Sequence, residues 1–253
     1  MITIKTEEQI ENMRFVCKLA KEILDELEEF IKPGITTKEI DDFAYNYIIK
    51  NDATPSFLGY EGYPASVCTS VNEEVVHGIP GKRILKDGDI VSVDIGAYKN
   101  NVHSDTARTY IVGSTTKEIE DLVNNTKKAL YEGIKVIKPG IKLNEVCKSI
   151  EKVAKDNGYG VIRELTGHGV GEEMHEDPYI PNYANKESEK ITLEKGMTLA
   201  IEPMFSLKGR EIFILEDGWT IITQDESVTA HFEHTVLVTE NGYEIMTGEW
   251  KNG

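Results

Sequence analysis

The strongest constraint on the fold is an internal repeat. The segment FIKPGITTKEIDDFAYNYI, from Phe30, resembles VIKPGIKLNEVCKSIEKVA, from Val136, and further matches follow downstream in the same order. LKDGDIVSVD aligns with LEKGMTLAIE, and HSDTARTYIV can be laid against HFEHTVLV. Several matches in one order favour a duplicated α+β unit, with halves at roughly residues 6–112 and 115–240. We expect the two halves to be related by a pseudo-twofold axis around a central antiparallel sheet.

The helices of each half carry start and stop signals. The predicted start signals are Thr6 with Gln9, Thr36 with Glu39, and Thr115 with Glu118. The first helix should end near Phe30 and its counterpart near Ile137, because Pro and Gly of the IKPG segments stop a helix. No Ser- or Pro-rich linker separates the halves, so we expect one domain over residues 1–253.

Charge and composition narrow the class of partner. The net charge of −16 argues against nucleic acid or an anionic membrane surface as the main partner. The longest apolar runs are too short to span a bilayer, and the first residues lack the pattern of a secretory signal. Cys17, Cys68 and Cys147 are odd in number and scattered, which fits reduced thiols better than a disulfide framework. We therefore expect a cytoplasmic protein with no membrane and no specific nucleic-acid partner.

A predicted β-hairpin carries the first two carboxylates of interest. Residues 89–112, DIVSVDIGAYKNNVHSDTARTYIV, alternate apolar side chains on either side of YKNN. With the loop centred between Lys99 and Asn100, Asp94 lies directly opposite Asp105, with Cβ atoms about 5 Å apart. A loop centred one residue later would break that pairing. Two facing aspartates repel, so one is protonated, the face is wet, or a cation lies between them.

The second copy of the repeat supplies two more carboxylates at the positions equivalent to Asp94 and Asp105. With Glu202 and Glu233 as the counterparts of Asp94 and Asp105, four carboxylates converge on the axis between the halves. Such a cluster requires about two divalent cations to balance its charge. His168, flanked by glycines, adds the imidazole that carboxylate sites often use for transition metals. The set fits a dinuclear site, with metals about 3.5 to 4 Å apart, that activates water for hydrolysis.

These motifs resemble those of the type I methionine aminopeptidases, members of the pita-bread metallopeptidase superfamily. In chain order they are LGYEGYPASVC, VNEEVVHGIP, DIVSVDIG, HSDTART, GHGVGEEMHEDP, TLAIEPMF, DGWT and FEHTVLVT. The resemblance covers essentially the whole chain. It implies the α+β pita-bread fold and a metal-dependent hydrolase that removes the N-terminal methionine of nascent proteins when the second residue is small. The lack of an N-terminal zinc-binding extension favours the bacterial type.

The resemblance also implies a metal role for five residues. Asp94 would bind one metal ion through both oxygens, and Asp105 and Glu233 would bridge a pair of ions. His168 and Glu202 would complete the other site, and Glu202 would also act as a catalytic residue that shuttles the proton of the attacking water. The two divalent ions could be Mn, Fe, Co or Zn.

Two of the remaining histidines occupy positions that have a role in the family, and the other three do not. His175 would contact the scissile carbonyl and stabilise the developing oxyanion, and His77 would contact the side of the peptide nitrogen, so both are predicted to be catalytic and to bind substrate. His103 and His231 have no matching role. His234 should point to the opposite face of its strand, away from the metals.

An apolar, sulfur-tolerant pocket would bind the methionine side chain. By family position, its predicted lining is Phe57, Tyr60, Tyr63, Cys68, Met174 and Trp219. Phe57 and Met174 depart from the enterobacterial pattern, which has a Cys and a Phe there. This departure leaves the detailed shape of the pocket open.

Two alternative functions are kept. The first is a proline-specific aminopeptidase or prolidase with the same metal ligands. Against it stand the lack of an additional N-terminal domain, the lack of a glycine after the proline of EPMF, and His234 where those enzymes usually have Asp. The second is a non-catalytic binding protein on this scaffold, although such proteins typically lose ligands. We expect a monomer that acts on N-terminal peptides, with a transient ribosome contact left open.

Overall fold

The computed structural model describes residues 2–250, so the ends of the predicted 1–253 domain lie outside the described residues. The α-helices are α1 (Glu7–Phe30), α2 (Thr37–Lys50), α3 (Lys117–Lys135) and α4 (Leu143–Asn157), and the short 3₁₀ helices are η1 (Tyr60–Gly62) and η2 (Ser188–Lys190). Among the described residues, no helix combines the length and apolarity that crossing a membrane requires.

The strands of the first half are β1 (Thr54–Pro55), β2 (Val67–Val71), β3 (Glu74–Val76), β4 (Ile90–Ile95), β5 (Ala97–Lys99), β6 (Val102–His103) and β7 (Thr106–Ile111). Those of the second half are β8 (Gly160–Val161), β9 (Thr166–Gly169), β10 (Glu176–Pro181), β11 (Thr198–Ile201), β12 (Met204–Ser206), β13 (Ile212–Ile214), β14 (Ile221–Thr223), β15 (Thr229–His231), β16 (His234–Val238) and β17 (Tyr243–Ile245).

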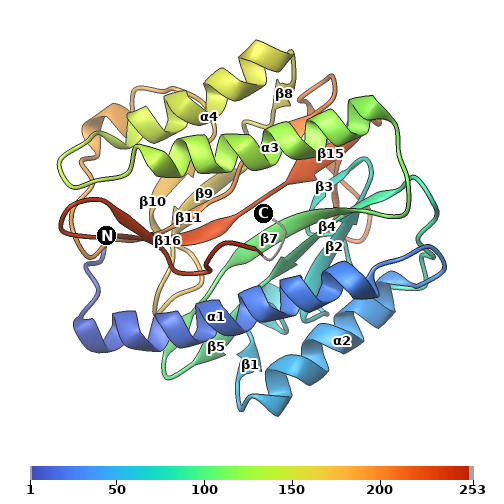
Figure 1. Ribbon diagram of the computed structural model, residues 1–253, viewed down its shortest axis with the longest axis horizontal. Helices are drawn as coiled ribbons and strands as arrows, with labels where there is room; N and C mark the ends of the chain where they lie inside the picture. The colour runs from blue at the N-terminus through green and yellow to red at the C-terminus, as the bar shows by residue number, and fades with distance from the viewer. Residues whose placement is uncertain (1, 251–253) are drawn as a thin grey trace.

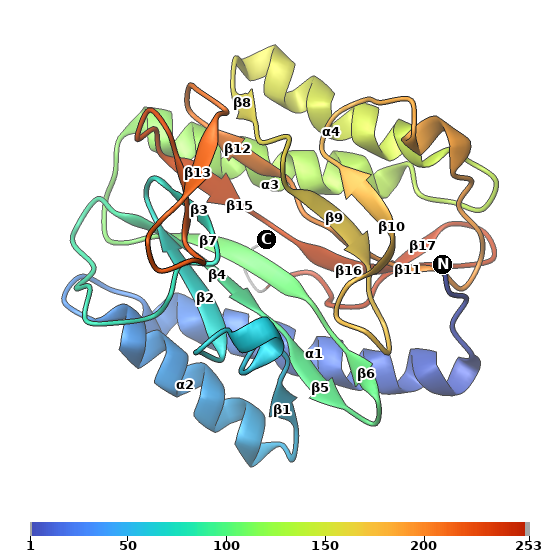
Figure 2. The ribbon, with the colours of Figure 1, turned by 180° about the vertical axis from the view of Figure 1, so that it is seen from behind.

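The strands form antiparallel sheets that the helices cover on one side. The first half contributes the sheet β2-β4-β7, and the second contributes β10-β9-β11-β16-β17. Three small sheets flank them, in the orders β1-β5-β6, β15-β12-β8 and β13-β14-β3. Helices α1 to α4 lie in front of the strands in Figure 1, and Figure 2 shows the opposite face, on which none of these four helices lies. The segregation of helices to one face of antiparallel sheets is the α+β architecture predicted from the sequence.

The predicted repeat is visible in equivalent backbone hydrogen bonds. The Gly34 N–H donates to the carbonyl of Leu85, and the Gly140 N–H donates to the carbonyl of Leu193, both at 2.8 Å. In each half, the IKPGI turn is therefore tied to the first residue of the segment that leads into β4 or β11. The same backbone bond is thus present at equivalent positions of the two halves.

The two halves meet along β7 and the segment that joins β15 to β16. Ala107 and Glu233 exchange backbone hydrogen bonds, with N–O distances of 2.9 and 3.4 Å. The Thr109 hydroxyl accepts from the His231 N–H at 2.9 Å and donates to the His231 carbonyl at 2.8 Å. These bonds form an antiparallel seam between the halves, and the pairing of β3 with β14 joins them at a second place.

The helix starts agree with the sequence at two of three places. Capping boxes occur at Thr6 and Thr36, and α1 ends at Phe30, all as predicted. The prediction that Thr115 opens the third helix was wrong, because Thr116 caps α3 by accepting from the backbone N–H of Ile119. The Thr115 hydroxyl instead donates to the carbonyl of Gly88 at 3.3 Å. Helix α3 ends at Lys135, close to the predicted end at Ile137.

The predicted loop of the hairpin was centred one residue too early, so the strand register was wrong by two residues. Lys99 pairs with Val102, so the loop consists of Asn100 and Asn101, and Asp94 lies opposite Ala107 instead of Asp105. Both asparagines have positive φ, 52° and 63°, as a two-residue loop with the right-handed twist of a hairpin requires. Asparagine tolerates this conformation better than lysine does, which explains the shift.

A separate hydrophobic core lies beneath each pair of helices. One packs α1 and α2 against β2 and β4, and the other packs α3 and α4 against the strands of the second half. Helices α3 and α4 approach closely at Gly133, where an added Cβ would lie 2.8 Å from Cγ1 of Ile150. A side chain at this position would therefore push the two helices apart.

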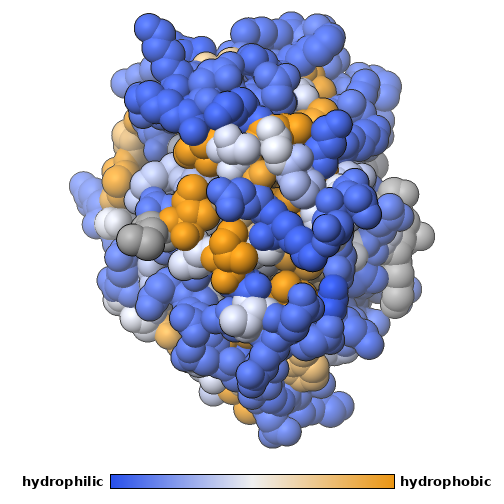
Figure 3. Space-filling view, turned by 90° about the vertical axis from the view of Figure 1, so that its left-hand side faces the viewer, coloured by the Kyte–Doolittle hydropathy of each residue, from blue (hydrophilic) through white to orange (hydrophobic). Residues whose placement is uncertain are grey.

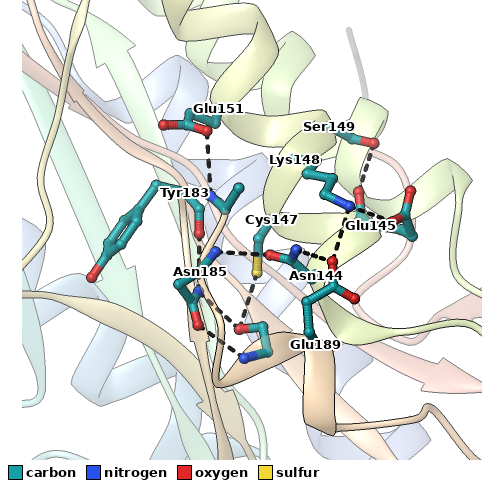
Figure 4. A network of polar contacts seen from close by, with 11 residues as sticks. Asn144, Glu145, Cys147, Lys148, Ser149, Glu151, Tyr183, Asn185 and Glu189 are labelled. Atoms are coloured by element: carbon teal, nitrogen blue, oxygen red, sulfur yellow. Dashed lines mark hydrogen bonds and ion pairs between the residues drawn. The ribbon is translucent and has the colours of Figure 1, made fainter.

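A polar network fastens α4 to the segment that follows β10 (Figure 4). Asn144 accepts from the backbone N–H of Asn185 at 2.9 Å and donates to Glu189 at 2.7 Å. The same segment begins with Asn182, whose amide donates to the backbone carbonyl of Glu202 at 2.9 Å. The network therefore connects α4 to the backbone of a predicted site residue.

The surface on the side shown in Figure 3 is largely hydrophilic, with small separated hydrophobic patches. This polar coat agrees with a chain in which 28% of residues are charged. Most of the residues predicted to be functional instead line one cavity.

Candidate metal centre and adjoining pocket

The ends of strands from both halves bring the predicted metal ligands together. Asp94 lies on β4, and Asp105 lies between β6 and β7. His168 lies on β9, Glu202 directly follows β11, and Glu233 lies between β15 and β16. All of these residues line one cavity of about 280 Å³. Although Asp94 does not face Asp105 directly, their side chains still meet, because residues offset by two positions lie diagonally on the same face of a sheet.

The imidazole of His168 points its free nitrogen at the carboxylates. Its Nδ1 lies 2.8 Å from the carbonyl of Gly169, to which it donates, so the lone pair is on Nε2. Nε2 lies 3.4 Å from Oδ2 of Asp105 and 3.5 Å from Oε1 of Glu202. Asp105, His168 and Glu233 each offer a ligand atom within 4.8 Å of the others. This tautomer and this grouping are those of a histidine-carboxylate metal site.

The electrostatics of the cluster favour a cation. Burial and the neighbouring carboxylates raise the pKa values of Asp94, Glu202 and Glu233 well above their usual range. Burial also raises the pKa of Asp105 to about 8. One carboxylate oxygen each of Asp94, Asp105 and Glu233 is buried and accepts no hydrogen bond from the described part of the protein. Buried oxygens of this kind need protons or a cation, so the donor set fits divalent metal ions.

The two histidines predicted to bind substrate, His77 and His175, lie beside the carboxylates and are neutral near pH 7. Burial lowers the pKa values of His77 and His175 to about 4. The ring of His175 lies 4.3 Å from that of His168, and its Nδ1 lies 2.9 Å from the hydroxyl of Tyr60. His77 has a φ of 59°, a left-handed conformation that is uncommon outside functional sites and turns. Both imidazoles line the same cavity as the carboxylates.

The loop that carries His175 is held by residues that the sequence analysis did not single out. Glu176 forms an ion pair with Lys5 at 2.6 Å, and both side chains are buried. On the other side of the loop, the carbonyl of Gly171 accepts from the backbone N–H of His103 at 2.7 Å. His103 itself lies outside the cavity lining, with its ring nitrogen 2.9 Å from the Ser56 hydroxyl.

His231 is a site residue that the sequence analysis left without a role. Its Nε2 lies 3.5 Å from Oε2 of Glu202, and the side chain is buried. Strand alternation was the available signal, because residues two apart on a strand share a face and His231 precedes Glu233 by two. The same rule correctly predicted that His234 points away from the carboxylates, because its ring nitrogens contact Thr247 and Tyr131.

An apolar cluster forms the wall of the cavity next to the carboxylates. It contains all six predicted pocket residues, Phe57, Tyr60, Tyr63, Cys68, Met174 and Trp219. Tyr63 and Trp219 meet edge to face at 5.1 Å, and the Tyr63 hydroxyl donates to the carbonyls of Val67 and Gly78. Met174 is 1% exposed and packs in this cluster, but it is not among the residues that line the cavity.

Further lining residues were not predicted. They are Glu61, Val76, Glu164, Leu165, Thr166 and Met204. Met204 follows Glu202 by two residues. Because side chains two apart in an extended segment point to the same side, the position of Glu202 in the cavity also predicts Met204 in its lining. The apolar members extend the wall formed by the predicted pocket residues, whereas Glu61 and Glu164 add acidic groups to the lining.

Comparisons of the sequence and of the structure with known proteins point to the same metallopeptidase family. The sequence profile of metallopeptidase family M24 matches residues 11–240. Methionine aminopeptidase 1 of Bacillus subtilis (strain 168) is 45% identical over 247 residues, covering 98% of this chain and 99% of that protein. The crystal structure of methionine aminopeptidase from Thermotoga maritima has a TM-score of 0.96 and 48% identity, covering 98% of this chain and all of that one.

A more distant relative shares the fold in a larger protein. The prolidase from Pyrococcus furiosus has a TM-score of 0.75 and 26% identity, and the match covers 98% of this chain but 66% of the prolidase. The chain thus matches methionine aminopeptidases over their whole length and a prolidase over part of its length.

Proposed function

The chain belongs to metallopeptidase family M24, and we propose that its reaction is the removal of the N-terminal methionine from newly made proteins in the cytoplasm. Its fold is the α+β pita-bread fold of that family. The observation that carries the proposal is the juxtaposition, in one cavity, of a buried carboxylate-imidazole cluster with an apolar, partly aromatic wall. The cluster supplies the hydrolytic chemistry, and the wall supplies selectivity for a methionine side chain.

The family implies divalent metal ions, and the cluster is suited to hold them. We assign the ligands as Asp94, Asp105, His168, Glu202 and Glu233, enough for two ions of the Mn, Fe, Co or Zn type. When bound, such ions lower the pKa of a water molecule and polarise the substrate carbonyl. The buried oxygens that accept no hydrogen bond support this assignment, because they are the atoms that ligation would satisfy.

The protein's own groups move the proton and stabilise the developing charge. Glu202 is largely buried beside the other carboxylates, which raises its pKa and suits its carboxylate to accept a proton from the attacking water. As the water oxygen bonds to the carbonyl carbon and the C–N bond breaks, that proton passes to the nitrogen of the leaving peptide. The Tyr60 hydroxyl can donate to Nδ1 of His175, which leaves Nε2–H of His175 free to donate to the carbonyl oxygen. His77, neutral on the same cavity, faces the nitrogen side.

The apolar wall is suited to a thioether. Aromatic rings such as Tyr63 and Trp219 make favourable contacts with sulfur, and Cys68 adds a small polarisable group. Cys68 lies directly opposite Asp94 in the β2–β4 pair, so the side-chain pocket begins next to the metal ligands. A methionine side chain in this pocket places its own α-amino group and carbonyl beside the carboxylates. We infer the preference for a small second residue from the resemblance to the methionine aminopeptidases.

The test compares peptides with the protein first stripped of metal. Met-Ala-Ser, Met-Leu-Ser and an Xaa-Pro peptide are assayed after addition of Mn, Fe, Co or Zn ions separately. We expect cleavage of Met-Ala-Ser with at least one ion, weak cleavage of Met-Leu-Ser and none of Xaa-Pro. Cleavage restricted to the Xaa-Pro peptide would replace this proposal with the proline-specific alternative. Binding of metal without cleavage of any peptide would favour a non-catalytic protein.

A further inference from the structure

His231 lies beside Glu202, and one of its ring nitrogens forms no hydrogen bond with the described residues. Its side chain is 1% exposed, and its Nε2 has no hydrogen-bond partner within the described residues. The carboxylate oxygen Oε2 of Glu202 lies 3.5 Å from this nitrogen. Leaving a buried polar group unpaired destabilises a folded protein, so the residue is poorly explained by stability alone.

We propose that His231 is a positioning residue for Glu202, donating from Nε2–H to Oε2 and thereby fixing the plane of the carboxylate. The inference rests on the role proposed above for Glu202 as ligand and proton carrier. The present separation is a few tenths of an ångström longer than a hydrogen bond, and such contacts often tighten when an active site is fully assembled.

Glu202 has a different imidazole at each of its two oxygens. His168 Nε2 lies 3.5 Å from Oε1, and His231 Nε2 lies 3.5 Å from Oε2. The His168 nitrogen carries the lone pair, because its other nitrogen donates to Gly169. A proton on the His231 nitrogen therefore makes the two oxygens inequivalent: Oε2 accepts a hydrogen bond, and Oε1 turns toward the metal cluster. Hydrogen bonds of this kind orient ligands and tune metal affinity.

The backbone of His231 is rigid enough to direct a second side chain. Its N–H and carbonyl both bond to the Thr109 hydroxyl across the seam between the halves. On its other edge it pairs with Met204, two residues beyond Glu202. The backbone carbonyl of Glu202 is held separately by Asn182. The carboxylate of Glu202 is the part that these backbone contacts leave free to rotate, and His231 supplies the missing restraint.

The experiment uses variants of the full chain and measures metal binding directly. His231→Gln keeps an N–H donor at a similar reach, whereas His231→Leu removes it. Calorimetric titration of each metal-free variant with Mn²⁺ should show the Leu variant binding about 10- to 100-fold more weakly and the Gln variant within about threefold of the parent. The visible spectrum of the Co²⁺-loaded Leu variant should differ from the parent spectrum, and the Gln variant should restore it.

The controls separate positioning from a general structural role. His234→Gln alters a buried histidine of the same segment that contacts Tyr131 and Thr247, and it should leave Mn²⁺ affinity unchanged. Metal-free His231→Leu should melt no lower than the parent, because Nε2 of His231 forms no hydrogen bond at its separation of 3.5 Å from Glu202. If this variant does not fold, His231→Met, which also lacks a donor, replaces it.

Two results would overturn the assignment. One is parent-like Mn²⁺ affinity in the variant without a donor, and the other is equal weakening by Gln and Leu. Because the readout is metal binding, it is independent of which peptide is cleaved. A failed peptide assay with normal metal binding would count against the proposed function and leave the positioning of Glu202 intact.

Discussion

The side chain of Thr235 holds the backbone of Asp105 across the seam between the two halves. Its hydroxyl donates to the Asp105 carbonyl at 2.7 Å and accepts from the Asp105 N–H at 3.2 Å. In the alignment of the repeats, Asp105 corresponds to Glu233 and Thr235 corresponds to Ala107. Ala107 and Glu233 are themselves hydrogen-bonded through their backbones. The pseudo-twofold axis therefore passes between two equivalent pairs, and each pair fixes one predicted bridging carboxylate.

Thr235→Val should destabilise the protein and loosen the metal site. The variant keeps the shape of the side chain but leaves the buried N–H and carbonyl of Asp105 without a partner, so the free energy of unfolding should fall by about 1–3 kcal/mol. Mn²⁺ affinity should fall as well, because Asp105 is less well fixed. Denaturant unfolding and calorimetry measure the two effects. Thr235→Ser, which retains the hydroxyl, is the matched control, and equal losses in both variants would contradict the explanation.

His168 and His175 should respond differently to removal. His168→Ala removes a predicted ligand, so Mn²⁺ binding should weaken at least about tenfold. His175→Ala removes a donor to the carbonyl oxygen, so metal binding should be retained while kcat falls by about 10²–10³. Calorimetry and steady-state kinetics with Met-Ala-Ser separate the two outcomes. Equal loss of metal in both variants would show that this division of roles is wrong.

The sequence predicted the site better than it predicted the local geometry. The alignment of the two repeats paired Asp94 with Glu202 and Asp105 with Glu233. Because this alignment rests on matches along the whole chain, an error in the position of one loop does not change which carboxylates it selects. The hairpin register was sensitive to such an error, because it depended on whether Lys99 or Asn101 occupied the turn. The two consecutive asparagines were the decisive local signal, since both adopt positive φ.

Two other features depended on tertiary packing. Met174 packs in the apolar cluster without lining the cavity, and its depth is set by how the loop of His175 lies against the short helix at Tyr60. No period in the sequence encodes that contact. His231, by contrast, could have been found by applying strand alternation backward from Glu233.

Metal removal should make stability depend on pH in a defined direction. Burial raises the pKa of Asp105 to about 8, against about 4 for an aspartate in the unfolded chain. Between pH 6.5 and 8, the folded metal-free protein therefore binds more protons than the unfolded chain, and the free energy of unfolding falls as pH rises. For one such group the loss is at most about 2 kcal/mol over this interval. Asp94, Glu202 and Glu233, whose pKa values are also raised well above their usual range, act in the same direction. Buried histidines such as His234, whose pKa is lowered to about 3, act in the opposite direction, mainly near pH 6.5, where a histidine of the unfolded chain is half protonated.

Thermal unfolding in the presence of a chelator checks this expectation. The melting temperature of the metal-free protein should be lower at pH 8 than at pH 6.5, and added Mn²⁺ should raise it most at pH 8. Asp105→Asn removes one of the titrating carboxylates and should reduce the dependence, while Asp94, Glu202 and Glu233 keep theirs. A metal-free melting temperature that is constant or rises over this interval would contradict the raised pKa of Asp105.

Trp219 should set the affinity for methionine more than the rate of hydrolysis. Its ring lies edge-on to Tyr63 at 5.1 Å, and Asp217 holds its backbone N–H at 2.8 Å, so the indole forms a fixed wall of the cavity. Trp219→Ala removes apolar contact worth about 1–3 kcal/mol, which predicts a KM for Met-Ala-Ser roughly 5- to 100-fold higher with a smaller change in kcat. Trp219→Phe should recover most of the affinity. Because the ring of His77 lies 6.3 Å from the indole, a fall in kcat at constant KM would instead mean that Trp219 acts by positioning His77.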